Sequence, residues 1–311
     1  MREADVCLEL FLEWLAQTHG RRFRVDGRED LPGGGLTVLA SAGPVRLAVE
    51  AQLLLGPVED PDWLALRDRL AREIAVDLPD SIALWIPPGA DLPSGAAGAQ
   101  EFVQMVRQAA TILQPQERSF VPLPITIYVK KMSDEGNLVM ASGGLSPYWA
   151  HLTELVRGSY GLDSTRLHRL PESEEHLEQL IETIWQQARE IESPGQGVEI
   201  ETIDAWTIQR LEGHSGVVIV GLPPQEIPDM GVAVRRNLRR ILADSAPRLR
   251  QREADLRALV VLGHYVRLEQ EGATTALRGY DPALYTGLEF VCLAADGLLK
   301  PLIQAPARPI L

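Results

Sequence analysis

The sequence has few cysteines, few lysines and no long apolar run. Two cysteines in 311 residues, Cys7 and Cys292, exclude a disulfide framework and, by themselves, a zinc site. Their apolar neighbours predict two buried free thiols. No apolar segment reaches the roughly 18 residues that a membrane span needs, and the acidic N-terminus does not match a secretory signal. We therefore expect a soluble, cytoplasmic protein that does not associate with membranes.

Positive charge is also scarce, because 30 Lys and Arg side chains stand against 43 Asp and Glu, a formal net charge of −13. Such an acidic protein repels nucleic acid on average, so nucleic-acid binding is disfavoured and would need a local basic patch. One candidate patch lies in the stretch "VRRNLRRIL", where helical spacing places four arginines opposite three apolar residues. The four arginines are Arg235, Arg236, Arg239 and Arg240. Their guanidinium groups suit phosphate, but they suit equally the acidic helix expected at 172–192 or an unknown protein partner.

Alternating strands and helices predict the fold class. Hydrophobic residues make up 45% of the chain, which provides a sizeable core. Apolar periodicity predicts helices at 4–18, 60–75, 98–113, 171–192 and 232–246. Short apolar runs predict strands at 21–25, 36–41, 45–55, 81–89, 216–222 and 256–268, a strand or hairpin at 288–303, and a hairpin over 120–144. Residues 149–171 give no clear pattern. We expect one α/β domain over 1–311 with a mixed central sheet flanked by helices, and place any division at 193–198.

The stretch "PVRLAVEAQLLLG", residues 44–56, carries the candidate site. Glu50 and Gln52 share one face of the expected strand, because side chains alternate along a strand. The order helix, strand, strand with an internal Glu, helix and strand over residues 4–88 resembles the restriction-endonuclease-like, or PD-(D/E)XK, nuclease superfamily. The resemblance implies that Glu50 binds Mg or Mn and that Gln52, at the usual lysine position, orients the attacking water.

The same resemblance requires further carboxylates near Glu50. Pro32 and Gly33 stand where the family has Pro-Asp. The remaining candidate metal ligands are upstream acids and helical acids, namely Glu29, Asp30, Glu9 and Glu13. The alternative for Glu50 is a structural carboxylate that is paired with Arg46 or exposed to water.

These patterns leave three functions open. We favour a non-catalytic or degenerate nuclease-like domain that acts as an interaction or accessory module, through a protein partner or self-association. The second is an active Mg- or Mn-dependent nuclease, which needs a second carboxylate within metal-bridging reach of Glu50. The third is a small-molecule enzyme, which needs an enclosed pocket elsewhere.

Overall fold

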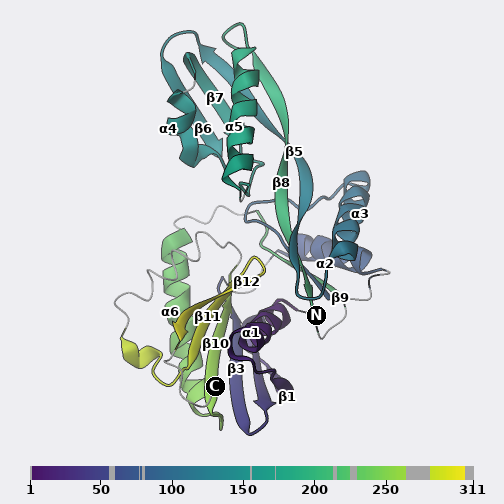
Figure 1. Ribbon diagram of the computed structural model, residues 1–311, viewed down its shortest axis with the longest axis vertical. Helices are drawn as coiled ribbons and strands as arrows, with labels where there is room; N and C mark the ends of the chain where they lie inside the picture. Colours follow the sequence, from purple (N-terminus) through teal and green to yellow (C-terminus); the bar gives the residue numbers. More distant parts are fainter. Residues whose placement is uncertain are drawn as a thin grey trace. The chain divides into compact units, whose positions relative to one another are not determined.

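The computed structural model confirms the α/β class. Within the residues that it describes, six α-helices flank two mixed, six-stranded sheets (Figure 1). The described residues are 2–55, 60–76, 78, 81–154, 156–171, 173–212, 216–224, 230–263 and 281–304. Of the strand expected at 256–268, the part after Gly263 lies outside the described residues. Among the described helices, none has the length and apolar character that crossing a membrane requires.

The chain forms two compact units, the second inserted into the first. The first unit comprises Met1–Ser119 and Thr207–Leu311, and the second comprises Phe120–Trp206. Both boundaries fall near the ends of long strands, β5 (Arg118–Ser133) and β8 (Gly197–Leu211), which belong to one sheet. The single domain expected from the sequence, with any division at 193–198, differs from this arrangement because the units are joined through strands and not through a linker.

The first unit is built around a sheet with the order β1-β2-β3-β10-β11-β12. The strands are β1 (Arg24–Asp30), β2 (Leu36–Ala42), β3 (Val45–Leu53), β10 (Leu256–Leu262), β11 (Phe290–Ala295) and β12 (Leu298–Gln304). The first three form an antiparallel meander, and β10 lies parallel to both β3 and β11. Helix α1 (Glu3–His19) packs on one face of this sheet and α6 (Met230–Arg250) on the other. The central strands β10 and β11 are therefore mostly apolar, since both of their faces are buried.

Local signals explain where these elements begin and end. Helix α1 ends at Gly20, which adopts the left-handed conformation and donates its N–H to the Ala16 carbonyl. The β11–β12 hairpin turns through Asp296 and Gly297, both with positive φ, as a two-residue turn of this kind requires.

A smaller strand group completes the first unit. β4 (Ser81–Trp85) lies between β9 (Gly216–Val220) and the end of β8. Helix α2 (Pro61–Ala75) packs against β9 and against α3 (Ala96–Ile112). Helix α2 begins at Asp60, whose carboxylate accepts the N–H of Trp63. The expected strand at 81–89 therefore exists, but it lies in the second sheet, and β10 is the strand beside β3.

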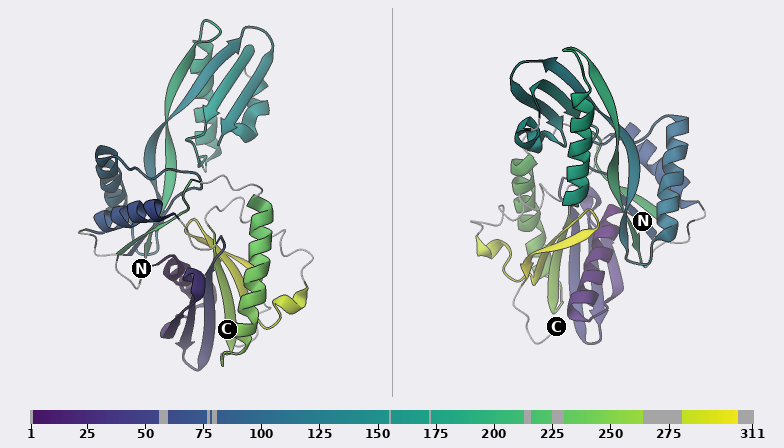
Figure 2. Two further views of the ribbon diagram at one scale, coloured as in Figure 1. Left: turned by 180° about the vertical axis from the view of Figure 1, so that it is seen from behind. Right: turned by 45° about the horizontal axis from the view of Figure 1, so that its top comes forward.

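The second unit, which Figure 2 shows from two further directions, contains a sheet with the order β6-β7-β5-β8. It includes β6 (Asn137–Gly143), β7 (Gly158–Ser164), α4 (Trp149–Glu154) and α5 (Glu174–Arg189). The hairpin expected over 120–144 is wrong, because β7 lies between β5 and β6, antiparallel to β5 and parallel to β6. Helix α5 buries Ile181, Ile184 and Trp185 in this unit's core.

Candidate functional site

Glu50 lies in the middle of β3, between β2 and β10, and is only 1% exposed. Its side chain points to the face of the sheet that α6 covers. Ala48, two residues earlier on the same face, belongs to the apolar cluster formed with α6. The candidate carboxylate is therefore inside the protein, where an uncompensated charge would be costly.

Three side chains donate hydrogen bonds to this carboxylate. The amide of Gln52 donates to Glu50 Oε1 at 2.8 Å, and the Ser245 hydroxyl donates to the same oxygen at 2.5 Å. The guanidinium of Arg248 donates through Nε to Oε2 at 3.3 Å and through Nη2 to Oε1. This bond to Glu50 is the largest cause that raises the pKa of Arg248 above its usual value. The carboxylate is thus paired and hydrogen-bonded, which is how a buried charge is tolerated.

Ser245 and Arg248 occupy one turn of α6, three residues apart, so both reach the same point on β3. The Gln52 side chain passes close to the backbone at Gly35. A Cβ at position 35 would lie 2.8 Å from Gln52 Oε1, so a larger residue would displace this amide. The hydrogen bond to Glu50 orients the Gln52 amide with its NH₂ group toward the carboxylate.

A hollow of about 450 Å³ adjoins this cluster. Its polar lining comes from Gln52 and from four residues of α6, namely Arg240, Asp244, Ser245 and Arg248. The loop that contains Pro32 and Gly33 forms another wall. The positions where the family would have Pro-Asp therefore lie beside Gln52, but they bring no carboxylate.

The other predicted metal ligands are engaged elsewhere. Glu29 shares a row with Glu50 across the sheet, but Thr37 of β2 lies between them. Two strand spacings separate the two acids by about 10 Å. The Glu29 carboxylate instead accepts Arg252 Nη2 at 2.5 Å. Asp30 is exposed and accepts Arg2 Nη2 at 2.6 Å, and this hydrogen bond lowers the pKa of Asp30.

The helical acids lie on α1, which covers the opposite face of the sheet from Glu50. Glu13 accepts a hydrogen bond from Gln17 on the same helix. Glu9 lies among Asp5, Glu13 and Glu212, and burial, reinforced by these charges, raises the pKa of Glu9 to about 7. Across the described part of the chain, no three His, Cys, Asp or Glu side chains come together as a metal site would need.

Arg46, which the sequence offers as a partner for Glu50, turns instead to Glu253 at 3.7 Å. The sequence did not predict the two residues of α6 that bind the Glu50 carboxylate, Ser245 and Arg248. Their spacing in "DSAPR" fits one helix turn, but nothing local in the sequence shows that this turn packs on β3.

Comparison with protein-family models, curated proteins and solved structures gives no match.

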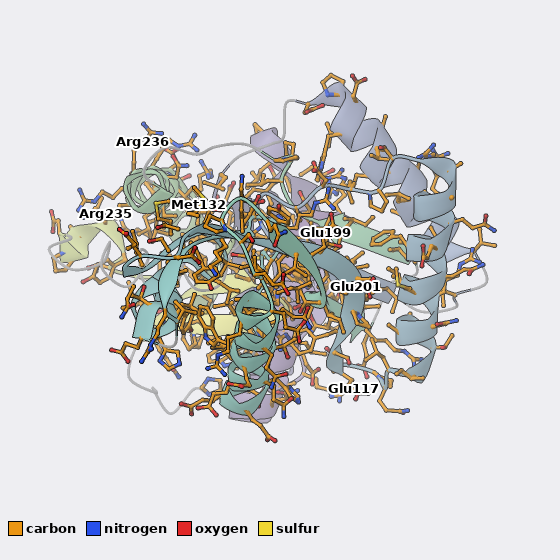
Figure 3. The ribbon with its side chains drawn as sticks, turned by 90° about the horizontal axis from the view of Figure 1, so that it is seen from above. Glu117, Met132, Glu199, Glu201, Arg235 and Arg236 are labelled. Carbon is orange, nitrogen blue, oxygen red and sulfur yellow. The ribbon has the colours of Figure 1, made fainter. Side chains whose placement is uncertain are left out.

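The four arginines of the basic patch lie on the exposed side of α6, and the apolar residues opposite them are buried. Arg235 and Arg236 are seen near the start of this helix in Figure 3. Of the four, Arg240 also lines the hollow beside Gln52. The acidic helix expected at 172–192 is α5, and it belongs to the second unit.

Two further buried carboxylates are satisfied within their own units. Asp204 is 1% exposed and accepts the backbone N–H groups of His168 and Arg169, His168 Nδ1–H and the indole N–H of Trp206. Asp296 accepts Arg118 Nη2 at 2.8 Å at the β11–β12 turn. Both groups stabilise loops.

Proposed function

We propose that the first unit is a nuclease-like fold in which the acid position has become a buried ion pair. The protein then acts as a non-catalytic interaction or accessory module. The fold part of this proposal is supported by the order of α1, β1, β2 and β3, with Glu50 on the last strand. The functional part rests on one observation: Gln52, Ser245 and Arg248 occupy the carboxylate of Glu50.

The residues around Glu50 do not fit a divalent cation. Mg²⁺ and Mn²⁺ need several oxygen ligands, and the neighbour of Glu50 on β2 is Thr37 where a second acid would be useful. The position of a cation is taken by the guanidinium of Arg248. Gln52 directs its NH₂ group to Glu50, so this amide is committed to the carboxylate and not to a water.

Calorimetric titration with Mn²⁺ tests the proposal on the wild type, Glu50→Gln and a matched variant, Glu29→Gln. We expect no binding heat that depends on Glu50. Any weak heat should be the same in all three proteins. Saturable binding that is lost in Glu50→Gln and kept in Glu29→Gln would contradict the proposal and support the nuclease alternative.

Cleavage assays with Mn²⁺ on supercoiled DNA and single-stranded RNA provide the second readout. The wild type should cleave no faster than Glu50→Gln. Both proteins must first show the same far-ultraviolet circular dichroism, so that loss of folding is not mistaken for loss of activity.

A further inference from the structure

The second unit has an unpaired strand edge. β8 enters the sheet of this unit over residues 197–206, and there its neighbour is β5. Strand β4 pairs with β8 only from Thr207 to Leu211, in the first unit. Within the described chain, the other side of β8 between 199 and 205 therefore has no strand partner. An exposed edge of this kind can accept an added strand.

The hydrogen bonds at the two ends of the β5–β8 ladder show which backbone groups face outward. Lys131 N–H donates to the Gln196 carbonyl, and Arg210 N–H donates to the Glu117 carbonyl. These two points are separated by equal numbers of residues on both strands, which is the spacing of a ladder without a net register shift. Even-numbered residues of β8 thus bond to β5, because antiparallel bonding alternates. Glu199, Glu201 and Ile203 direct their N–H and C=O groups to the free edge.

A groove runs beside this edge. A hollow of about 910 Å³ is lined by one flank of α5, by β8 and by Phe120 and Pro124 of β5. The flank presents His176, Gln179, Leu180 and Thr183, which recur at helical spacing, and Leu170 and Pro171 add apolar surface. Ile203 is 52% exposed and contributes to the same hollow. A groove between a helix and a free strand edge suits an extended peptide, which gains backbone hydrogen bonds and places alternate side chains in the groove.

The charge of the second unit indicates which kind of extended peptide the groove would bind. Residues 120–206 contain 14 acidic side chains and 6 basic ones. Glu199 and Glu201, labelled in Figure 3, are exposed on β8. The basic residue of the groove, Arg169, lies over the ring of Phe120. A second copy of β8 would set acidic side chains against acidic surface, which is unfavourable, whereas a basic strand complements it.

We propose that an extended segment of a partner protein, with basic and apolar residues on one face, adds as a strand to β8 at 199–205. On the face of β8 that Glu199, Glu201 and Ile203 share, its basic side chains meet Glu199 and Glu201, and its apolar side chains lie beside Ile203 in the groove. This inference is independent of the role of Glu50, because every residue that carries it lies in the second unit.

The test uses the full chain and a fluorescein-labelled peptide, about nine residues long and capped at both ends, in which every second residue is Lys or Val and the residues between them are Thr. Binding is followed by fluorescence anisotropy. The matched peptides have Glu in place of Lys, or N-methyl groups on the amides of one edge. We expect the Lys peptide to bind, more weakly at high salt, and the Glu peptide not to bind. N-methylation should weaken binding roughly tenfold or more, because it removes the donors that strand addition uses.

A pair of variants at Ile203 tests the same point on the protein. Ile203→Pro removes an outward N–H without touching the β5 ladder, a position where an edge strand tolerates proline. Ile203→Thr keeps the N–H. We expect the proline variant to bind roughly tenfold more weakly than the threonine variant. The pair Glu199→Gln and Glu201→Gln should weaken binding several-fold, while Glu174→Gln and Glu178→Gln on α5 should not.

Three results would overturn the proposal. The first is no binding of the Lys peptide at about 1 mM. The second is equal binding of the N-methylated peptide to the wild type, which needs no folded variant. The third is equal affinity of Ile203→Pro and Ile203→Thr when both retain the wild-type circular dichroism. None of these results bears on the Mn²⁺ titration at Glu50, so the two proposals fail separately.

Discussion

Removing Arg248 should destabilise the first unit strongly while Glu50 is present, and much less when Glu50 is replaced by glutamine. Arg248→Ala leaves a carboxylate that is 1% exposed without its cation. Breaking a fully buried ion pair costs about 3–5 kcal/mol. The Arg248 side chain is 44% exposed, so water compensates in part, and we expect about 2–3 kcal/mol. In the double variant no unpaired charge remains, so the coupling energy should be about 1.5–2.5 kcal/mol.

Hydrogen exchange measured by mass spectrometry is the suitable assay, because two units need not unfold together. Amides of β3 and α6 report on the site, and amides of β6 and β7 in the second unit serve as an internal control. Arg252→Ala is the matched variant, since it breaks the exposed pair with Glu29 and should cost no more than about 0.5 kcal/mol. A coupling energy below about 0.5 kcal/mol between positions 50 and 248 would refute the ion-pair argument.

Three other perturbations have expected outcomes. The pKa of Glu9 is raised to about 7, so protonation of this carboxyl favours the folded protein. The free energy of unfolding should therefore fall as pH rises from about 4.5 to 7. Glu9→Gln should remove about 1–2 kcal/mol of this decline, allowing for solvent screening, and an unchanged slope in urea titrations at several pH values would contradict it. Burial raises the pKa of both Cys7 and Cys292, so neither thiol should react with a disulfide reagent at pH 8 until urea unfolds the first unit; rapid labelling of the native protein would be the opposite result. Asp204→Asn loses acceptor capacity for His168 and Trp206. It should lower the free energy of opening of the second unit, measured by hydrogen exchange, by about 2–3 kcal/mol, with the first unit as the control.

Elements with a strong local signal could be predicted from the sequence. Helices α1, α2, α3, α5 and α6 and most strands of the first sheet lie within a few residues of their expected positions. Apolar periodicity and breakers such as Gly20 carry that information within a short window. The α/β class follows from the alternation of these elements.

Pairing between strands could not be predicted in the same way. The expected hairpin over 120–144 has the right strands and the right turn, yet β7 inserts between them from a stretch without a clear pattern. Strand β8 was missed, although Val198, Ile200 and Ile208 alternate with polar residues along much of it. Its acidic residues obscure that alternation, and the same residues define the free edge. The two-unit organisation was missed because strands, and no linker, cross the boundary.

The role of Glu50 shows most clearly where local inference ends. "VEAQ" on a buried strand has the same pattern whether its carboxylate binds a metal or an arginine. The choice depends on Ser245 and Arg248, which lie 195 and 198 residues further along the chain. Only the packing of α6 on β3 brings them to the carboxylate, and the second unit is encoded between the two elements. A guanidinium at hydrogen-bonding distance satisfies the charge that a cation would otherwise satisfy. The residue that decides the chemistry of this site is therefore set by topology, which a single strand of sequence does not reveal.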